Sequence, residues 1–195
     1  MLETLITSIF CFLVIAAAII VISLEYYYTK TKVSAVSSLP WMRRAVVKVM
    51  RDMLHNHRSD SSLKIYELGS GWGPLAIDAA RAFPKAKVVG LEFSPIPLWF
   101  SILRGKLFGH KHLSFKKADF FEEDLRDADV IVLYMLESIL EKLAPKFKEE
   151  LKPGAIIISN TFEIKDWKPI HVETVMEKVI KLNVYVYQVP KSVPA

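Results

Sequence analysis

The sequence has 195 residues, which provides for one domain of ordinary size and leaves little room for a second. A single cysteine excludes an intramolecular disulfide framework and a thiolate cluster for a metal. The net charge of +5 is spread along the chain, so a nucleic-acid partner is not required, and a basic surface that attracts anionic lipid headgroups is the more typical cause.

An uncharged apolar stretch runs from Leu5 to Leu24 and contains the one cysteine, Cys11. A helix of about 20 residues, at about 1.5 Å per residue, spans a bilayer core of roughly 30 Å. Three tyrosines, residues 26–28, follow where amphipathic rings favour the headgroup layer. We therefore predict a single-pass anchor with an aromatic belt over residues 1–28, which contacts the membrane through residues 5–24.

The charges that flank this stretch predict its direction. Lys30 and Lys32 follow it, whereas Glu3 is the one charged side chain before it. Because positive charge favours the inner side, everything after the span should face the cytoplasm or its organellar equivalent. A cleaved signal peptide is the alternative, but Val33-Ser34-Ala35 is a poor cleavage site. No arginine-rich presequence indicates mitochondrial import, although a mitochondrial membrane stays open for a eukaryotic chain.

Residues 29–39 are small and polar and are expected to form a linker to a domain over residues 40–195. A helix from Pro40 to Leu54 should follow, since Val46, Val47 and Met50 recur at helical spacing among basic residues. This helix should either lie against the membrane surface or cover one edge of a cofactor site.

Short β-rich runs then alternate with helical stretches, which predicts an α/β domain with a parallel sheet covered on both faces. The last two runs follow each other closely and should close the sheet as an antiparallel pair. The expected strands are Lys64 to Leu68, Lys87 to Phe93, Leu113 to Lys117, Val130 to Tyr134, Ala155 to Ser159, Ile170 to Met176 and Asn183 to Val189, and the helices are Leu75 to Phe83, Ile96 to Leu107 and Leu136 to Leu151.

A glycine-rich turn follows the first strand, where an open α/β sheet binds ligands. Glu67 ends that strand, and Gly69, Ser70, Gly71 and Gly73 form the turn. Glycine lets the backbone turn sharply and approach a ligand closely. A dinucleotide site has a different glycine spacing, whereas acid-x-Gly-x-Gly-x-Gly is the pattern for S-adenosylmethionine, whose ammonium the acid can attract.

Two further acids end the next two strands. Glu92, with Phe93 beside it, is placed to accept both ribose hydroxyls, and Asp119 is placed for the adenine amino group, with Phe120 against the ring. A lone acid at a strand end is usually a helix cap or a solvated charge. Three acids behind three successive strands instead predict S-adenosylmethionine as the cofactor.

Candidate acceptor residues follow the fourth strand. Tyr134 and Glu137 are candidates for removing a proton from an ammonium acceptor, and Tyr134 and Met135 are candidates for contacting the substrate. Trp167 could form part of an acceptor wall or could simply pack in the core. The sequence Asn-Pro-Pro-Tyr, which holds planar amino groups, is absent, and this counts against methylation of a base or amide.

Two histidine pairs, residues 55 and 57 and residues 110 and 112, lack a third ligand, so we expect no metal site. A nucleic-acid partner is also not expected, because the sequence has no basic patch interleaved with aromatic residues.

With these motifs in hand, the chain resembles the membrane-anchored class I protein-lysine methyltransferases that include the ATP synthase c-subunit and adenine nucleotide translocase lysine methyltransferases. The resemblance implies a Rossmann-like seven-stranded sheet, S-adenosylmethionine as donor and lysine side chains of membrane proteins as acceptors. The sequence departs from the usual residues of this family at positions 72–74 and at the end of the fourth strand, and both differences concern the acceptor side. The resemblance rests on the apolar anchor, Glu67-Leu-Gly-Ser-Gly, Gly90-Leu-Glu92 with Pro95, the helix from Leu136 to Leu151, Phe162 and Trp167-x-Pro169.

The leading hypothesis is thus an N-methyltransferase for a protein lysine at a membrane. Alternatives are a lipid amine or small hydrophobic acceptor, and a non-catalytic nucleotide-binding membrane module.

Overall fold

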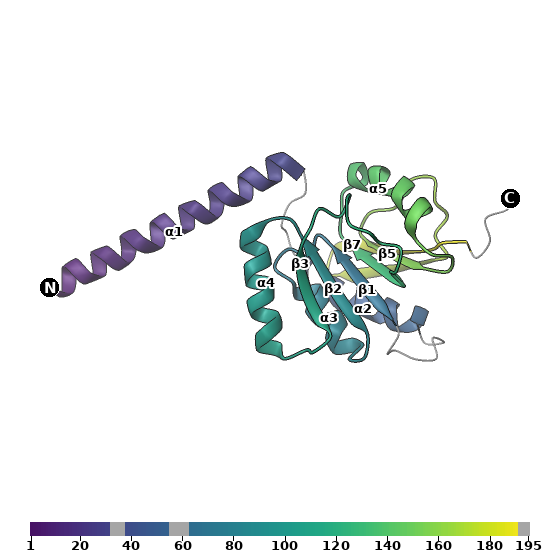
Figure 1. Cartoon of the computed structure of the whole chain (residues 1–195), viewed down its shortest axis with the longest axis horizontal. Helices are drawn as coiled ribbons and strands as arrows, with labels where there is room; N and C mark the ends of the chain where they lie inside the picture. Colours follow the sequence, from purple (N-terminus) through teal and green to yellow (C-terminus); the bar gives the residue numbers. More distant parts are fainter. Residues whose placement is uncertain (32–37, 55–62, 191–195) are drawn as a thin grey trace.

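A seven-stranded sheet forms the centre of the domain, with strand order β3-β2-β1-β4-β5-β7-β6 (Figure 1). The computed structural model describes residues 1–31, 38–54 and 63–190. The first five strands pair in parallel, and β6 and β7 pair antiparallel, as predicted from the sequence. Strand β7 is also antiparallel to β5. The strands are β1 (Lys64–Leu68), β2 (Lys87–Glu92), β3 (Leu113–Lys117), β4 (Val130–Leu133), β5 (Ile156–Asn160), β6 (His171–Glu177) and β7 (Ile180–Gln188).

The helices cover both faces of this sheet. On one face α2 (Pro40–Leu54) and α3 (Pro74–Ala82) bury an apolar cluster, with α4 (Pro95–Phe108) beside α3 and over β3. On the opposite face α5 (Glu137–Glu150) packs on a second cluster that contains Leu140, Leu143 and Phe147. The structure confirms the expected helix from Pro40 to Leu54, whose buried residues pack on the sheet and on α3.

Burial along the strands follows from their place in the sheet. All four residues of the central strand β4 are buried, because both of its faces lie under helices. The edge strands β3 and β6 alternate between exposed and half-buried residues instead. The continuous apolar runs in the sequence therefore belong to the inner strands, whose carboxyl ends position the site described below.

The N-terminal helix α1 (Leu2–Thr31) is longer than predicted, since the expected linker at residues 29–39 begins with helix. The Thr29 hydroxyl donates to the Tyr26 carbonyl at 2.8 Å, and Lys30 Nζ lies 4.8 Å from the centre of the Tyr26 ring. These local contacts continue the helix to Thr31. Residues 32–37, with the weak cleavage site, and the His55 and His57 pair lie outside the described residues.

By length and composition, α1 is able to cross a membrane. The segment Leu2–Lys30 contains an 18-residue window of mean hydropathy 3.1 that the domain does not bury. A signal sequence near an N-terminus meets the same criteria, so they show an apolar helix and not yet a membrane span.

Candidate active site

The glycine turn connects β1 to α3 at the carboxyl end of the parallel strands. Gly69, Gly71 and Gly73 all have positive φ, at 67°, 53° and 80°, which explains why residues without a Cβ stand there. The Ser70 amide donates to the Leu91 carbonyl of β2 at 2.8 Å, and the Gly73 amide donates to the Ser70 carbonyl at 2.8 Å. The turn is therefore fixed by its own backbone and by the neighbouring strand.

Glu67 is buried at the end of β1, next to the start of α3. Burial raises the pKa of its carboxyl well above the usual range, and the Glu92 charge acts in the same direction, whereas a hydrogen bond from the Ala76 amide opposes the shift. Oxygen Oε2 of Glu67 has no hydrogen-bond partner among the residues that the structure describes. A cationic ligand at the turn would stabilise the ionised carboxylate.

Glu92, at the end of β2, is buried and fixes the same turn. One of its oxygens accepts a hydrogen bond from the Gly71 amide at 2.8 Å, and the other accepts one from the Ser94 amide at 2.7 Å. A carboxylate offers about four lone-pair sites, so each oxygen keeps capacity for a second donor. Glu92 is thus both a brace for the turn and an available acceptor for hydroxyl groups.

The unpartnered polar atoms of the turn fit S-adenosylmethionine. Among the residues that the structure describes, three buried side-chain nitrogen or oxygen atoms lack a hydrogen-bond partner, and two of them, Glu67 Oε2 and Ser70 Oγ, lie at this turn. Buried polar atoms are rarely left unpaired unless a ligand or water completes them. An ammonium and ribose hydroxyl groups provide the donors that such acceptors need.

Three strand ends meet at Gly69. A Cβ atom built on Gly69 would lie 2.5 Å from the Cε atom of Met135 and 3.9 Å from a ring carbon of Phe120. Met135 follows β4 and Phe120 follows β3, and both are buried. The structure therefore brings together three residues that were assigned from the sequence separately, to the donor and to the acceptor.

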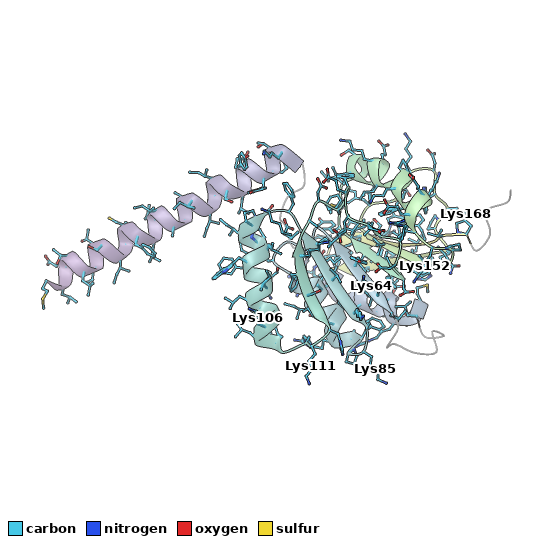
Figure 2. The ribbon with its side chains drawn as sticks, viewed as in Figure 1. Lys64, Lys85, Lys106, Lys111, Lys152 and Lys168 are labelled. Atoms are coloured by element: carbon cyan, nitrogen blue, oxygen red, sulfur yellow. The ribbon has the colours of Figure 1, made fainter. Side chains whose placement is uncertain are left out.

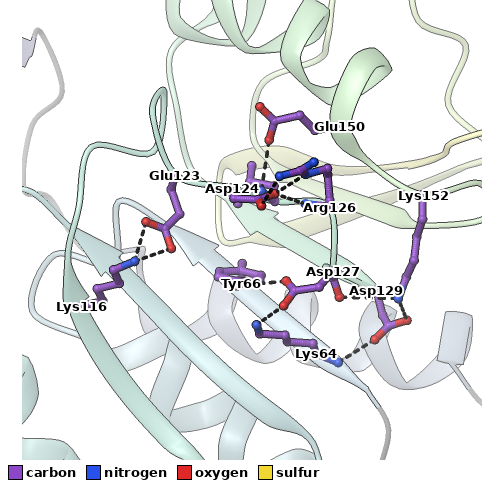
Figure 3. Close-up of polar contacts among 11 residues, drawn as sticks. Lys64, Tyr66, Lys116, Glu123, Asp124, Arg126, Asp127, Asp129, Glu150 and Lys152 are labelled. Atoms are coloured by element: carbon purple, nitrogen blue, oxygen red, sulfur yellow. Dashed lines mark hydrogen bonds and ion pairs between the residues drawn. The ribbon is translucent and has the colours of Figure 1, made fainter.

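Asp119 stands at the start of the loop between β3 and β4, residues 118–129. One carboxylate oxygen of Asp119 accepts a hydrogen bond from the Phe121 amide at 2.9 Å, which shapes the first turn of the loop. Ion pairs hold the rest of the loop against β1, β3 and the turn between α5 and β5 (Figure 3). The pairs are Lys116 with Glu123, Arg126 with Asp124, Lys64 with Asp127, and Lys152 with Asp129.

The packing of the Phe115 ring against the glycine turn was not predicted from the sequence. A Cβ atom on Gly73 or Gly90 would lie 2.7 Å or 2.5 Å from this ring, and one on Gly105 would lie 3.0 Å away. The ring thus fills the space beside three glycines from β2, α4 and the turn. Gly73 therefore makes room for Phe115. Gly90 and Gly105, which lie outside the glycine motif, were the sequence feature that could have indicated a bulky side chain packed against them.

Phe93, assigned to the cofactor from the sequence, contacts the N-terminal helix. Its ring lies 5.6 Å from that of Tyr27, with an interplanar angle of 75°. Tyr27 is half-buried, whereas Tyr26 and Tyr28 on either side of it are exposed. The last turns of α1 therefore lie beside the strand end that carries Glu92.

The candidate acceptor residues lie at the neighbouring strand ends. Tyr134, after β4, is 38% exposed, and its ring stacks on Phe162, after β5, with centroids 6.1 Å apart and an interplanar angle of 21°. Glu137 is exposed in the first turn of α5, where a negative charge also stabilises the helix. Phe162 was not assigned to the acceptor side from the sequence.

Trp167 packs against Tyr187 and Lys148. Its ring packs edge-on against that of Tyr187, with centroids 6.1 Å apart, and Lys148 Nζ lies over the ring, 5.7 Å from its centroid. It is half-buried and packs against the apolar cluster under α5, and its place in an acceptor wall stays a prediction. Within residues 1–31, 38–54 and 63–190, no group of three His, Cys, Asp or Glu side chains is arranged to hold a metal ion.

Comparison with known proteins identifies the family. A profile of the ANTKMT methyltransferase domain matches residues 67–171, from the glycine turn to the start of β6. The chain belongs to this family. The predicted family, enzyme class and cofactor are thereby confirmed, and the chain is an S-adenosylmethionine-dependent methyltransferase.

Curated relatives include protein-lysine methyltransferases. The chain is 34% identical over 141 residues to a protein-lysine N-methyltransferase of Saccharolobus islandicus, covering 72% of this chain and 88% of that protein. It is 30% identical over 135 residues to the ATP synthase c-subunit lysine N-methyltransferase of Rattus norvegicus, covering 68% of this chain. It spans 59% of the length of the rat protein.

Solved structures confirm the fold. An RNA methyltransferase from Salinibacter ruber in complex with S-adenosyl-L-homocysteine superposes with a TM-score of 0.66 at 31% identity, covering 82% of this chain and 97% of that one. A SAM-dependent O-methyltransferase from Thermotoga maritima has a TM-score of 0.63 at 15% identity, over 85% of this chain and 71% of that one.

Proposed function

We propose that this chain methylates lysine side chains of proteins at a membrane surface. The observation that carries the proposal is the contact between donor turn and acceptor side. Met135 lies over Gly69, and Tyr134, the preceding residue, stacks on Phe162 at the same edge of the sheet. The relatives named as protein-lysine methyltransferases support lysine as the acceptor.

The chemistry asks the protein to orient two reactants and to exclude water. S-adenosylmethionine supplies an electrophilic methyl group on a sulfonium. The lysine nitrogen uses its lone pair to form the new C–N bond as the C–S bond breaks. An ammonium has an ordinary pKa of about 10.4, so the acceptor must first lose a proton. In this proposal Tyr134 accepts that proton in its phenolate form and becomes a neutral phenol.

The aromatic pair suits a lysine side chain. An alkylammonium is attracted to the face of an aromatic ring, and the four-carbon stem packs on the same apolar surface. Tyr134 and Phe162 present such faces beside Met135. Glu137 is exposed in the first turn of α5, and in this proposal its negative charge attracts the cationic acceptor. Its part in proton removal stays a prediction.

Membrane attachment is the second part of the proposal. Residues 1–28 form the anchor, and residues 40–195 form the catalytic domain, on the cytoplasmic or equivalent side that the lysines after the span indicate. The contact between Tyr27 and Phe93 supports this, because it keeps the donor site close to the end of the apolar helix.

An RNA acceptor is the second candidate, because the Salinibacter ruber structure is named an RNA methyltransferase. A lipid amine is a third acceptor that a membrane anchor would bring within reach. Incubation of the full chain with labelled donor, native membranes and total RNA separates these acceptors. We expect label in the protein fraction, on lysine, and much less label with Glu92→Gln at the same donor concentration. Label confined to RNA or to lipid would overturn the lysine proposal.

A further inference from the structure

Helix α4 is apolar on the face that the domain leaves uncovered. Its inner face packs on β3, β2 and α3 through Leu98 and Ser101. Its outer face carries Trp99, Leu103 and Leu107, which are 61%, 41% and 76% exposed. These three residues, here called the α4 stripe, are spaced four residues apart and so lie along one side of the helix.

A helix with apolar residues on two opposite sides is stable when both sides are covered. The domain covers the inner side of α4 only, and the stripe puts an indole and two leucines in line on the surface. Contiguous exposed apolar surface of this kind marks a site of interaction with another molecule or a membrane.

The position of α4 next to α1 indicates which surface covers the stripe. The ring contact between Tyr27 and Phe93 joins the end of α1 to the segment that leads directly into α4, and the two helices are also in direct contact. In Figure 1, α4 forms the flank of the domain from which α1 extends, and it runs across the direction of α1. A helix that crosses a membrane would therefore bring α4 to the bilayer surface.

The polar residues of α4 suit the same surface. The helix contains Arg104 and Lys106 and no acidic residue. Lys106 (Figure 2) is exposed and follows Leu103 by three residues, so helical spacing places it beside the stripe. Tryptophan favours the headgroup layer, and lysine can reach anionic headgroups while its stem lies on apolar surface.

We propose that α4 is an interfacial membrane helix, which lies in the headgroup and acyl boundary of the bilayer through Trp99, Leu103 and Leu107. The inference rests on the proposed membrane attachment of α1. It gives the domain two points of contact with the bilayer, the anchor and the stripe. The carboxyl edge of the sheet, from which α4 starts, is thereby held at the membrane surface, and acceptor lysines are restricted to those close to the bilayer.

The experiment uses the full chain in phospholipid nanodiscs that contain anionic lipid. Cys11 is the one cysteine, so Cys11→Ser provides a background for a fluorescent label at Leu103→Cys. The matched control carries the label at Met176→Cys on β6, where the native side chain is 67% exposed. Quenching by brominated lipid chains is then measured for each label, and a label at native Cys11 reports on the anchor.

We expect the label at position 103 to be quenched several-fold more strongly than the label at position 176. Equal quenching at these two positions overturns the proposal, whether or not the Cys11 label is quenched. Shielding of position 103 from water without quenching by lipid, together with cross-linking between two copies, also overturns it, since the stripe would then be a dimer contact.

Methylation of membrane proteins is measured on the same nanodisc samples. Lysine methylation without quenching at position 103 rejects the interfacial helix and leaves the proposed function standing. Quenching without lysine methylation rejects the proposed function and leaves the interfacial helix standing. A triple variant with Trp99, Leu103 and Leu107 each changed to Gln should keep its donor affinity but methylate membrane acceptors several-fold more slowly.

Discussion

The site has a donor half, at the ends of β1 and β2, and an acceptor half, at the ends of β4 and β5, and the two halves are held by different interactions. At the ends of β1 and β2, buried carboxylates and backbone amides hold a turn in one conformation, with Glu92 joined to the amides of Gly71 and Ser94. At the ends of β4 and β5, the half-exposed rings of Tyr134 and Phe162 are held by stacking. The hydrogen bonds of the donor half fix the orientation of its polar groups. The apolar surface of the acceptor half does not fix the orientation of what it binds.

This difference matches the two ligands. The donor is a single small molecule, so fixed buried polar groups can match each of its polar atoms. The acceptor is a side chain that arrives on a larger partner, and aromatic surface accepts it without demanding one orientation. Variants of the donor half should therefore change donor affinity or folding, and variants of the acceptor half should change acceptor use alone.

The largest expected effect is on stability, from Gly73→Ala. The position has φ of 80°, and a Cβ there would lie 2.7 Å from Ser101 Cβ and from the Phe115 ring. Backbone strain and overpacking together should lower the free energy of unfolding by about 4 kcal/mol. Gly109→Ala is the control, because its φ is 66° with nothing within 4 Å, and it should cost only about 1 kcal/mol. Equal costs in denaturant titrations would contradict the role given to Phe115.

The next effect is on donor affinity, from Glu92→Gln. The amide would present its NH₂ group to the Gly71 or Ser94 N–H, so one buried donor loses its acceptor. We expect affinity for S-adenosylhomocysteine to fall about 10- to 100-fold by calorimetry. Glu122→Gln, on an exposed side chain of the neighbouring loop, should leave the affinity unchanged. Wild-type affinity in Glu92→Gln would remove Glu92 from the donor site.

A smaller effect concerns proton release, from Glu67→Gln. The pKa of Glu67 is raised in the free protein, so binding of a cationic donor should expel up to about one proton. Donor affinity should then rise with pH until Glu67 is ionised in the free protein. Calorimetry in buffers of different ionisation enthalpy counts the protons. A count for Glu67→Gln that matches the wild type would contradict an electrostatic role for Glu67.

The Glu67 carboxyl also contributes to the pH dependence of the stability of the free protein. The pKa of Glu67 in the folded protein lies above its ordinary value of 4.5. The protonated carboxyl therefore contributes fully to the free energy of unfolding below pH 4.5, and this contribution is lost as pH rises through the raised pKa. Glu67→Gln should flatten this part of the curve of melting temperature against pH. An unchanged curve would mean that Glu67 titrates normally.

The smallest expected effect is on the acceptor half, from Phe162→Leu. Loss of one ring from the stacked pair should raise the acceptor KM about three- to tenfold, because an aromatic face contributes roughly 1 kcal/mol to such contacts. Donor affinity, measured on the same protein, is the internal control. A parallel loss of donor affinity would show that the two halves are not separate.

Much of the fold could be predicted because the parallel strands are continuous apolar runs and the turns carry glycine and proline. The observed bounds of β1 and β3 match the predicted ones, and those of the other predicted strands differ by a few residues at most. The positions of Glu67, Glu92 and Asp119 at the carboxyl ends of β1, β2 and β3 also match those predicted, and their roles toward the cofactor stay predictions.

Other features depend on contacts between residues distant in sequence, which periodicity does not record. The ring of Phe115 between three glycines, the stacking of Tyr134 on Phe162, and the packing of Tyr27 on Phe93 are all of this kind. Trp167 was ambiguous for the same reason, because a tryptophan in a core and one in a binding wall have the same local sequence.

Residue-level mass spectrometry of membrane proteins tests lysine methylation most directly. Membranes from cells that express the wild-type chain would be compared with membranes from cells that express equal amounts of folded Glu92→Gln. We expect lysines, close to predicted membrane spans, that are methylated with the wild type and much less methylated with the variant. Identical sets of methylated lysines in the two samples would contradict the proposed function.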